Sequence, residues 1–463
     1  MTLNPIAYPT PQPPPLPYSQ PAGSGRSRLI TVIAWIVIWG CLAVVAYANW
    51  RAARTAGRVE ATEHFQLVLT SRIVLGEVRI LPGSPELRAR MKGQAIAQLT
   101  KLATEPGDKL RVAVVIGEVE GGKAALERLD SAAPQLKTPE GKADLATLRT
   151  IYTSGADAVP PAARDELIGH QGWFGKLALS FGRPDSDPLR AQVMRAAERA
   201  FVATLAVEGT ATIAALVGLG LLIVAMIQLA SGRIHLCYGR APTLTTAFLE
   251  SFALYLAGYV AIGLSARLLA PRVMYLGMLL SLLWMPIAML WPLARGVSWA
   301  QLKGGLGWYV GRGVLREMGA GIVGYIAGLP LVVIAMIVSL ILTTRTGSNA
   351  SHPIMFGETH GVWPIVELYL LASVLAPLVE ETMFRGALFT HLRQRHGWLL
   401  SAVVSAFIFA ALHPQGWTFI PVLGTMGFVF AGIREWRGTF LASAAAHALN
   451  NGVMVTVLIL AMR

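Results

Sequence analysis

The residues with the clearest chemical potential lie in three short motifs near the C-terminal end of the chain. They comprise two glutamates, two histidines, an arginine and an asparagine: Glu380, Glu381, Arg385, His413, His447 and Asn451. Each motif lies in or at the end of an apolar stretch, where an ionisable side chain costs about 2.5–3.5 kcal/mol and needs a functional reason. Carboxylate, imidazole and amide groups together can activate a water molecule and stabilise the oxyanion that its attack creates.

The two adjacent glutamates have different environments on a helix. Glu381 and Arg385 are four residues apart and share a face, so they can form an ion pair. Glu380 points about 100° away from Glu381 and has no such partner. A poorly solvated carboxylate without a cation to neutralise it suits a general base, and we predict that role for Glu380. The alternative is that both glutamates are polar residues at the cytoplasmic edge of a span.

The histidine motifs place further polar groups on apolar helices. Phe409 and His413 are four residues apart, and so are His447 and Asn451. The latter two side chains therefore point to one side of their helix, and they must face the bundle interior because lipid offers them no partners. Two such donors can form an oxyanion hole. Asn450 lies off this face and is the weaker candidate, while His413 taken alone is also compatible with an interfacial histidine.

Together the motifs Glu-Glu-x-x-x-Arg, Phe-x-x-x-His and His-x-x-x-Asn, in this order, resemble the CPBP family of CAAX prenyl proteases and bacteriocin-processing enzymes, also called Abi proteins. The resemblance covers about residues 363–461 and implies an intramembrane endopeptidase. It implies a role for each matching pair of residues: Glu380 and His413 activate a water, His447 and Asn451 stabilise the oxyanion, and Glu381 and Arg385 support the helix and tune Glu380.

The composition indicates a polytopic integral membrane protein. Of 463 residues, 54% are hydrophobic and only 14% are charged, against roughly 25% charged residues in a soluble domain. The net charge of +13 lies mostly in the extramembrane domain and short loops, which indicates positive-inside topology and contact with anionic headgroups; we expect no nucleic-acid partner. Cys41 and Cys237 have no paired spacing, so a disulfide framework, a zinc knuckle and a cysteine nucleophile are not predicted.

We predict an all-α fold: a polytopic transmembrane bundle of about eight or nine spans with an extramembrane helical domain. Residues 1–28 read as a disordered, proline-rich tail, 29–48 as a first transmembrane helix, 51–200 as a soluble, mostly helical domain, and 205–463 as the membrane-embedded bundle. The candidate spans are about 29–48, 210–230, 244–264, 274–294, 320–342, 363–384, 399–413, 418–433 and 439–461.

The positive charges of the loops predict the topology. Arg26 and Arg28 precede the first span, and alternate loops are rich in Arg and Lys. One side of the membrane receives Arg233, Arg240, Arg295, Lys303, Arg312, Arg316, Arg385, Arg393, Arg395, Arg434 and Arg437, and the other receives Arg267, Arg272 and Arg345. The richer side should be cytoplasmic. This predicts a cytoplasmic N-terminus, an extracytoplasmic 51–200 domain and insertion into the cell (inner) membrane.

The sequence is compatible with three functional hypotheses. The first is an endopeptidase that cleaves a membrane-associated protein or peptide with a Glu-activated water and no cofactor. The second uses the same site with zinc, since Glu380, His413 and His447 match a catalytic His₂Glu ligand set, although no His-Glu-x-x-His is present. The third is a non-catalytic membrane scaffold or immunity-type protein. Replacing Glu380 by Gln separates the enzymatic readings from the scaffold.

Residue spacing outside the three motifs gives further predictions about packing and metal binding. Gly324 and Gly328 form a Gly-x-x-x-Gly pair suited to helix packing. A loop holding His352, Glu358 and His360 has no tight metal-ligand spacing. A straight span 399–413 would also separate His413 from Glu380 by much of the membrane. We therefore expect the Glu380 helix to continue past Arg385, or the spans to tilt.

Overall fold

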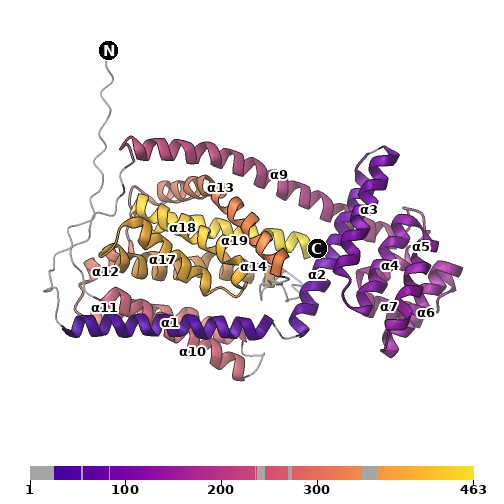
Figure 1. Ribbon diagram of the computed structural model, residues 1–463, viewed down its shortest axis with the longest axis horizontal. Coiled ribbons are helices and arrows are strands. Elements are labelled where there is room, and N and C mark those ends of the chain that lie inside the picture. Colours follow the sequence, from indigo (N-terminus) through magenta and orange to yellow (C-terminus); the bar gives the residue numbers. More distant parts are fainter. Residues whose placement is uncertain are drawn as a thin grey trace, which may run out of the picture. The chain divides into compact units, whose positions relative to one another are not determined.

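The computed structural model describes residues 25–53, 56–82, 84–234, 236, 246–269, 274–346 and 362–462. Throughout these ranges every regular element is a helix, which confirms the all-α prediction (Figure 1). Residues 1–24, Cys237 and the loop with His352, Glu358 and His360 lie outside the described residues. The first helix, α1 (Gly25–Ala53), begins before position 29, so the end of the predicted tail belongs to it.

The chain divides into two compact units. One contains Ala211–Thr456 together with the N-terminal residues up to Thr55, and the other contains Ala56–Thr210 with the residues after Thr456. Within the first unit, apolar side chains such as Ile213, Leu216 and Leu340 are largely exposed. Such a surface is stable against lipid and not against water.

Seven described helices are long and apolar enough to cross a membrane. Five are single helices: α1, α9 (Pro188–Ala230), α10 (Ala247–Leu269), α13 (Val314–Thr346) and α19 (Phe440–Met462). The sixth is the composite helix Val362–Arg393, and the seventh is Trp417–Arg437, which includes α18 (Ile420–Arg437). The shorter apolar helices are Leu283–Ala294, within α11 (Met274–Ala294), and α17 (Trp398–Ala411). The protein is therefore an integral membrane protein with a polytopic helical bundle.

The composite helix with the two glutamates is longer than the sequence predicts. It consists of α14 (Val362–Tyr369), a wide π-helical stretch Leu370–Leu375, α15 (Ala376–Glu380), a second π-helical stretch Glu381–Leu388 and α16 (Phe389–Arg393). The prediction that this span ends at 384 and that Arg385 belongs to a loop is wrong, because Arg385 is fully buried. Hydropathy falls there because polar residues enter the protein interior rather than water. The expectation that the helix continues past Arg385 is confirmed.

Glycines allow α13 to pack closely against α18 (Figure 1). A Cβ atom on Gly324 would lie 2.7 Å from the Ile433 side chain, and one on Gly328 would lie 2.6 Å from Val429. Both distances are too short for real carbon atoms. The predicted packing role of the Gly-x-x-x-Gly pair is therefore confirmed.

Arginines that the sequence assigns to loops lie in the last turns of α16 and α18 and contact neighbouring elements there. Arg437 pairs with Glu317 at 2.6 Å and Arg393 with Glu435 at 2.8 Å. Arg434 donates to the Gly305 carbonyl in the short helix α12 (Trp299–Leu306). These contacts join three of the arginine-rich segments and fix the ends of α13, α16 and α18.

The second unit is built from short helices around α4 (Pro106–Glu120), most of which is buried. The others are α2 (Ala56–Ile80), α3 (Pro85–Leu102), α5 (Gly122–Ala132), α6 (Pro139–Ser154), α7 (Pro161–Gln171), α8 (Trp173–Leu179) and the first part of α9. Buried Asp144 of α6 accepts hydrogen bonds from Gln171 and from Nδ1 of His170, so polar contacts join α6 to the end of α7. His170 thus has a structural partner.

The His170–Asp144 contact predicts a pH-dependent stability. The hydrogen bond that His170 Nδ1 donates to Asp144, at 3.0 Å, and the charge of Asp144 raise the pKa of His170. The stabilisation is therefore complete below the unfolded-state pKa of about 6.5 and is lost as pH rises through the higher folded-state pKa. We expect His170→Gln to speed amide exchange in α6 and α7 relative to wild type at about pH 5.5 but not at about pH 8.5. Equal differences at both pH values, after correction for intrinsic exchange, would contradict this assignment.

Candidate active site

A buried ion pair lies at the centre of the three motifs. Arg385 Nη1 lies 2.9 Å from Glu381 Oε1, and both side chains are completely buried. This is the ion pair that their four-residue spacing predicts. Arg385 also donates from Nη2 to the Gly427 carbonyl of α18, and its guanidinium carbon lies 4.6 Å from the centre of the Phe409 ring. The pair therefore connects the composite helix to α17 and α18.

His447 of α19 lies between the two glutamates. Its Nδ1 is 3.0 Å from Glu381 Oε1, and its Nε2 is 3.7 Å from Glu380 Oε2. The ring stacks on Phe430 with a centroid distance of 4.8 Å and an interplanar angle of 21°. Glu381 and Phe430 therefore fix the ring so that Nε2 points towards Glu380.

Glu380 differs from its neighbour in both exposure and partners. Its side chain retains 25% of its accessible surface, whereas Glu381 retains none. Glu380 Oε2 is nevertheless buried and has no hydrogen-bond partner within the described residues, and the same is true of Glu381 Oε2. A half-open carboxylate with an unsatisfied buried oxygen can accept a hydrogen bond from a water or a substrate group.

His413 lies just beyond the end of α17, within electrostatic range of Glu380, His447 and Arg385. Its Nδ1 is 2.7 Å from the Phe409 carbonyl oxygen, which can only accept. The proton of a neutral ring is therefore on Nδ1, and Nε2 carries a lone pair. Asn49 of α1 donates to the His413 carbonyl and holds the bend that follows the helix. The separation of His413 from Glu380 that straight spans imply is thus absent.

Asn451 is fixed by a directed chain of hydrogen bonds. Tyr325 of α13 donates to Asn450 Oδ1, the Asn450 amide donates to Asn451 Oδ1, and the Asn451 amide donates to the Ala372 carbonyl. Each donor leaves one possible orientation for the next amide, so Asn451 Nδ2 faces the composite helix. One of its two amide hydrogens is engaged by Ala372, which leaves the other for a ligand.

The π-helical stretch makes the Ala372 carbonyl available. The Ala376 amide donates to Leu371, five residues back, instead of to Ala372. The next residue able to reach Ala372 in a wide turn is Pro377, which has no N–H. The carbonyl therefore lacks a donor from its own helix and accepts one from Asn451 instead.

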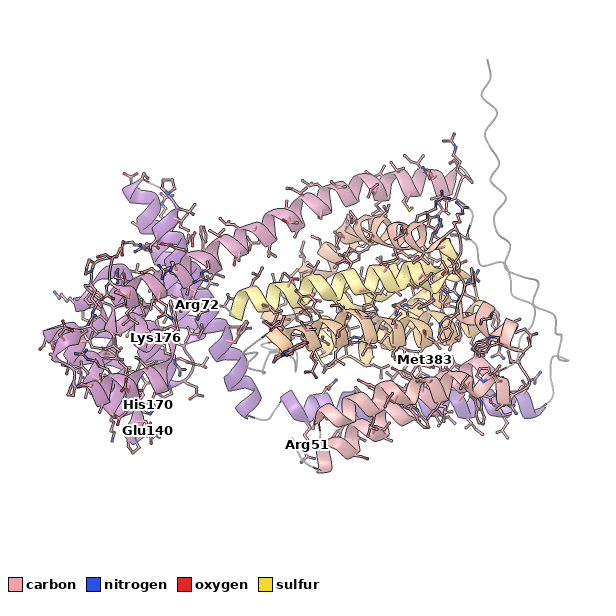
Figure 2. All side chains as sticks on the ribbon, turned by 180° about the vertical axis from the view of Figure 1, so that it is seen from behind. Arg51, Arg72, Glu140, His170, Lys176 and Met383 are labelled. Atoms are coloured by element: carbon pink, nitrogen blue, oxygen red, sulfur yellow. The ribbon has the colours of Figure 1, made fainter. Side chains whose placement is uncertain are left out.

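The structure thus brings all six predicted residues into one region and adds others that sequence patterns do not single out. The added residues are Tyr325 of α13, Asn49 of α1 and Phe430 of α18. In the sequence, the only sign of Tyr325 and Asn49 is a polar side chain within an apolar helix, and Phe430 has no such sign. Met383, labelled in Figure 2, lies two residues after Glu381 and is fully buried. Within the described residues, no group of three His, Cys, Asp or Glu side chains is arranged to hold a metal ion.

Comparisons with known proteins agree with the position of these motifs. Residues 362–453 match the family model described as Rce1-like, type II CAAX prenyl endopeptidase Rce1-like. This segment runs from α14 into α19 and contains all three motifs, so the resemblance to the CPBP family is confirmed over it.

Two relatives match part of the chain. The membrane-embedded CAAX protease MroQ of Staphylococcus aureus (strain USA300) is 30% identical over 135 residues, which are 28% of this chain and 54% of that protein. UPF0177 protein YxdF of Lactococcus lactis subsp. lactis (strain IL1403) is 24% identical over 117 residues, which are 25% of this chain and 64% of that protein. The chain thus spans less than two thirds of either relative. No solved structure matches it.

The buried pair predicts a large stability cost for Glu381→Gln. The change leaves the Arg385 charge without its counterion in a fully buried site, and breaking a buried pair costs about 3–5 kcal/mol. We expect a clearly lower melting temperature in detergent. Glu250→Gln is the control, because Glu250 pairs at 2.9 Å with Arg295, whose side chain is 37% exposed, while that of Glu250 is 11% exposed. The arginine left behind is not sealed in the interior, so its loss should cost less than that of Glu381. Equal melting temperatures for the two variants would show that Arg385 is stabilised by its other contacts alone.

Proposed function

We propose that this protein is an intramembrane endopeptidase that hydrolyses a peptide bond in a membrane-associated protein or peptide. The observation that carries the proposal is the pair of adjacent glutamates in different environments. Glu381 is fully buried and pairs with Arg385, whereas the Glu380 side chain keeps 25% of its surface exposed and can meet a water molecule. The family match over residues 362–453 supports the same reaction class.

In the proposed first step, Glu380 accepts a proton from a water molecule as the water oxygen attacks the peptide carbonyl carbon. His413 assists in positioning this water, because its Nδ1 is occupied by Phe409 and its Nε2 lone pair can accept the second water hydrogen. The attack breaks the carbonyl π bond and leaves a tetrahedral intermediate with a negative oxygen. The proton held by Glu380 then passes to the leaving nitrogen as the C–N bond breaks.

The negative oxygen requires donors that are already in place. The second amide hydrogen of Asn451 is one, and His447 Nε2 is the other when the ring carries a proton there. Both groups are held by other residues before substrate binds, His447 by Glu381 and Asn451 by the chain that starts at Tyr325. Fixed donors need no reorganisation during the reaction and are therefore effective in stabilising the oxyanion.

Zinc hydrolysis at the same residues is the second candidate. One observation favours it: His413 and His447 each engage Nδ1 with an oxygen, as metal-ligating histidines commonly do. Against it, the described residues include no three-ligand group of suitable geometry. If zinc were bound, Glu380, His413 and His447 would hold it, and the ion would polarise the water.

Replacing Glu380 by Gln tests the function. The substitution keeps size and hydrogen bonding but removes the base, so we expect the single-turnover rate to fall by about 10²–10⁴-fold with little change in melting temperature. Substrates for this assay can be found by comparing new N-termini in host membranes that contain the wild-type or the Glu380→Gln protein. Glu250→Gln serves as the control that keeps the rate.

The outcomes of this experiment distinguish the metal-free endopeptidase from the zinc-dependent enzyme and from the non-catalytic scaffold. Identical N-termini in both membranes would reject the endopeptidase and leave a scaffold. If activity disappears in a strong chelator and returns with zinc, the reaction uses the metal. A Glu380→Gln protein that melts early and keeps its rate, beside a stable and inactive Glu381→Gln protein, would mean that the roles of the two glutamates are reversed.

The hydrogen-bond chain predicts a positioning role for Tyr325. Tyr325→Phe removes the first donor, worth about 0.5–1.5 kcal/mol, and allows both asparagine amides to turn. We expect kcat to fall by up to about tenfold while KM stays within about twofold, since only oxyanion stabilisation is affected. Tyr369→Phe is the control, because the Tyr369 hydroxyl bonds Thr456 and not the asparagines. A change in KM alone would place Tyr325 in substrate binding instead.

A further inference from the structure

The helical unit of Ala56–Thr210 contains a cavity of about 420 Å³ that has no part in the proposed reaction. Three basic side chains line it: Arg72 from α2, Lys176 from α8 and Arg199 from α9. Figure 2 shows Arg72 and Lys176 in the same region of this unit. An apolar wall faces them and consists of Ile168, Trp173 and Val193. We call this cavity the cationic pocket.

The charges of the cationic pocket are not balanced by the protein. No lining residue is acidic, and no ion pair to Arg72, Lys176 or Arg199 is found among the described residues. Five other arginines of the unit each pair with a carboxylate at 3.0 Å or less: Arg79, Arg111, Arg149, Arg183 and Arg190. Three like charges around one cavity repel one another, and a bound anion would offset this repulsion.

Buried donors in the pocket also lack acceptors. Arg72 Nε and Trp173 Nε1 are both buried without a hydrogen-bond partner in the described part of the chain. The Arg72 guanidinium lies over the Trp173 ring, 5.5 Å from its centre, so the two side chains hold each other in place. Burial and then the nearby Arg199 charge lower the pKa of Arg72. Buried donors in folded proteins usually have an acceptor, and a ligand oxygen in the cavity can supply one for these two groups.

From these observations we infer that the cationic pocket binds a phosphate group carried by an apolar or aromatic molecule. Phosphate oxygens are acceptors, which matches a lining that offers guanidinium, ammonium and indole donors. A phosphate dianion also balances three positive charges better than a single carboxylate does. The apolar wall accommodates the rest of the ligand, which can be the acyl part of a phospholipid or the body of a soluble phosphate ester. The inference does not depend on the proposed peptidase activity.

Calorimetric titration of the full-length protein in a non-ionic detergent tests this inference. The probes are phenyl phosphate, inorganic phosphate, benzoate and a short-chain phosphatidic acid below its micelle concentration. We expect phenyl phosphate or phosphatidic acid to bind at least about tenfold more tightly than inorganic phosphate, because burial of an apolar group adds to the affinity. Preference for phosphatidic acid indicates a lipid ligand, and preference for phenyl phosphate a soluble one.

Matched variants locate the binding. Arg199 is exposed, so Arg199→Gln should fold normally and weaken phosphate binding by about tenfold or more, as expected for loss of a charge-assisted hydrogen bond. Arg195→Gln is the control, because Arg195 is an exposed arginine of the same helix that does not line the pocket. The inference is overturned if neither ester binds, if benzoate binds more tightly than both esters, or if both variants bind alike.

Discussion

The buried charge of Arg385 is the constraint on which the arrangement of the site depends. A guanidinium with no exposed surface needs a counter-charge and polar contacts from fixed groups, because its burial is otherwise costly. Glu381 supplies the counter-charge, Gly427 supplies a carbonyl, and the ring of Phe409 lies against the planar cation. These groups come from the composite helix, α18 and α17, so the contacts of Arg385 join the three helices, although its Nε has no hydrogen-bond partner among the described residues. Through Glu381 the same pair sets the orientation of His447.

The wide turns of the composite helix free a backbone carbonyl, and this carbonyl positions Asn451. An ordinary α-helix would pair the Ala376 amide with the Ala372 carbonyl, and Asn451 would then find no free acceptor there. The five-residue bond from Ala376 to Leu371, followed by a proline that cannot donate, leaves that carbonyl to Asn451. A local deviation of the backbone thus holds a side chain of another helix, which agrees with the frequent occurrence of π-helical turns at functional sites.

The sequence predicts those features that depend on helical geometry alone. The Glu381–Arg385 pair follows from a four-residue spacing, and the contact of α13 with α18 follows from two glycines on one face. The end of the span at 384 was mispredicted because hydropathy cannot distinguish a polar side chain that enters water from one buried in protein. The donation from Tyr325 to Asn450 joins residues 125 positions apart and has no periodic signal. The proline next to the freed Ala372 carbonyl is visible in the sequence, but its effect requires the register of the neighbouring helix.

The two consecutive glutamates explain how one turn of helix can provide both rigidity and reactivity. Neighbouring residues on a helix point about 100° apart, so one can face the packed interior while the other faces an opening. Glu381 faces Arg385 and His447 and retains no exposed surface, while Glu380 retains a quarter of its own. In the proposed reaction Glu380 is the general base and has to meet water, whereas a counterion to a buried arginine has to be kept from it. One carboxylate cannot meet both conditions. His447 contacts both glutamates, so the buried Glu381 positions the His447 ring beside the partly exposed Glu380.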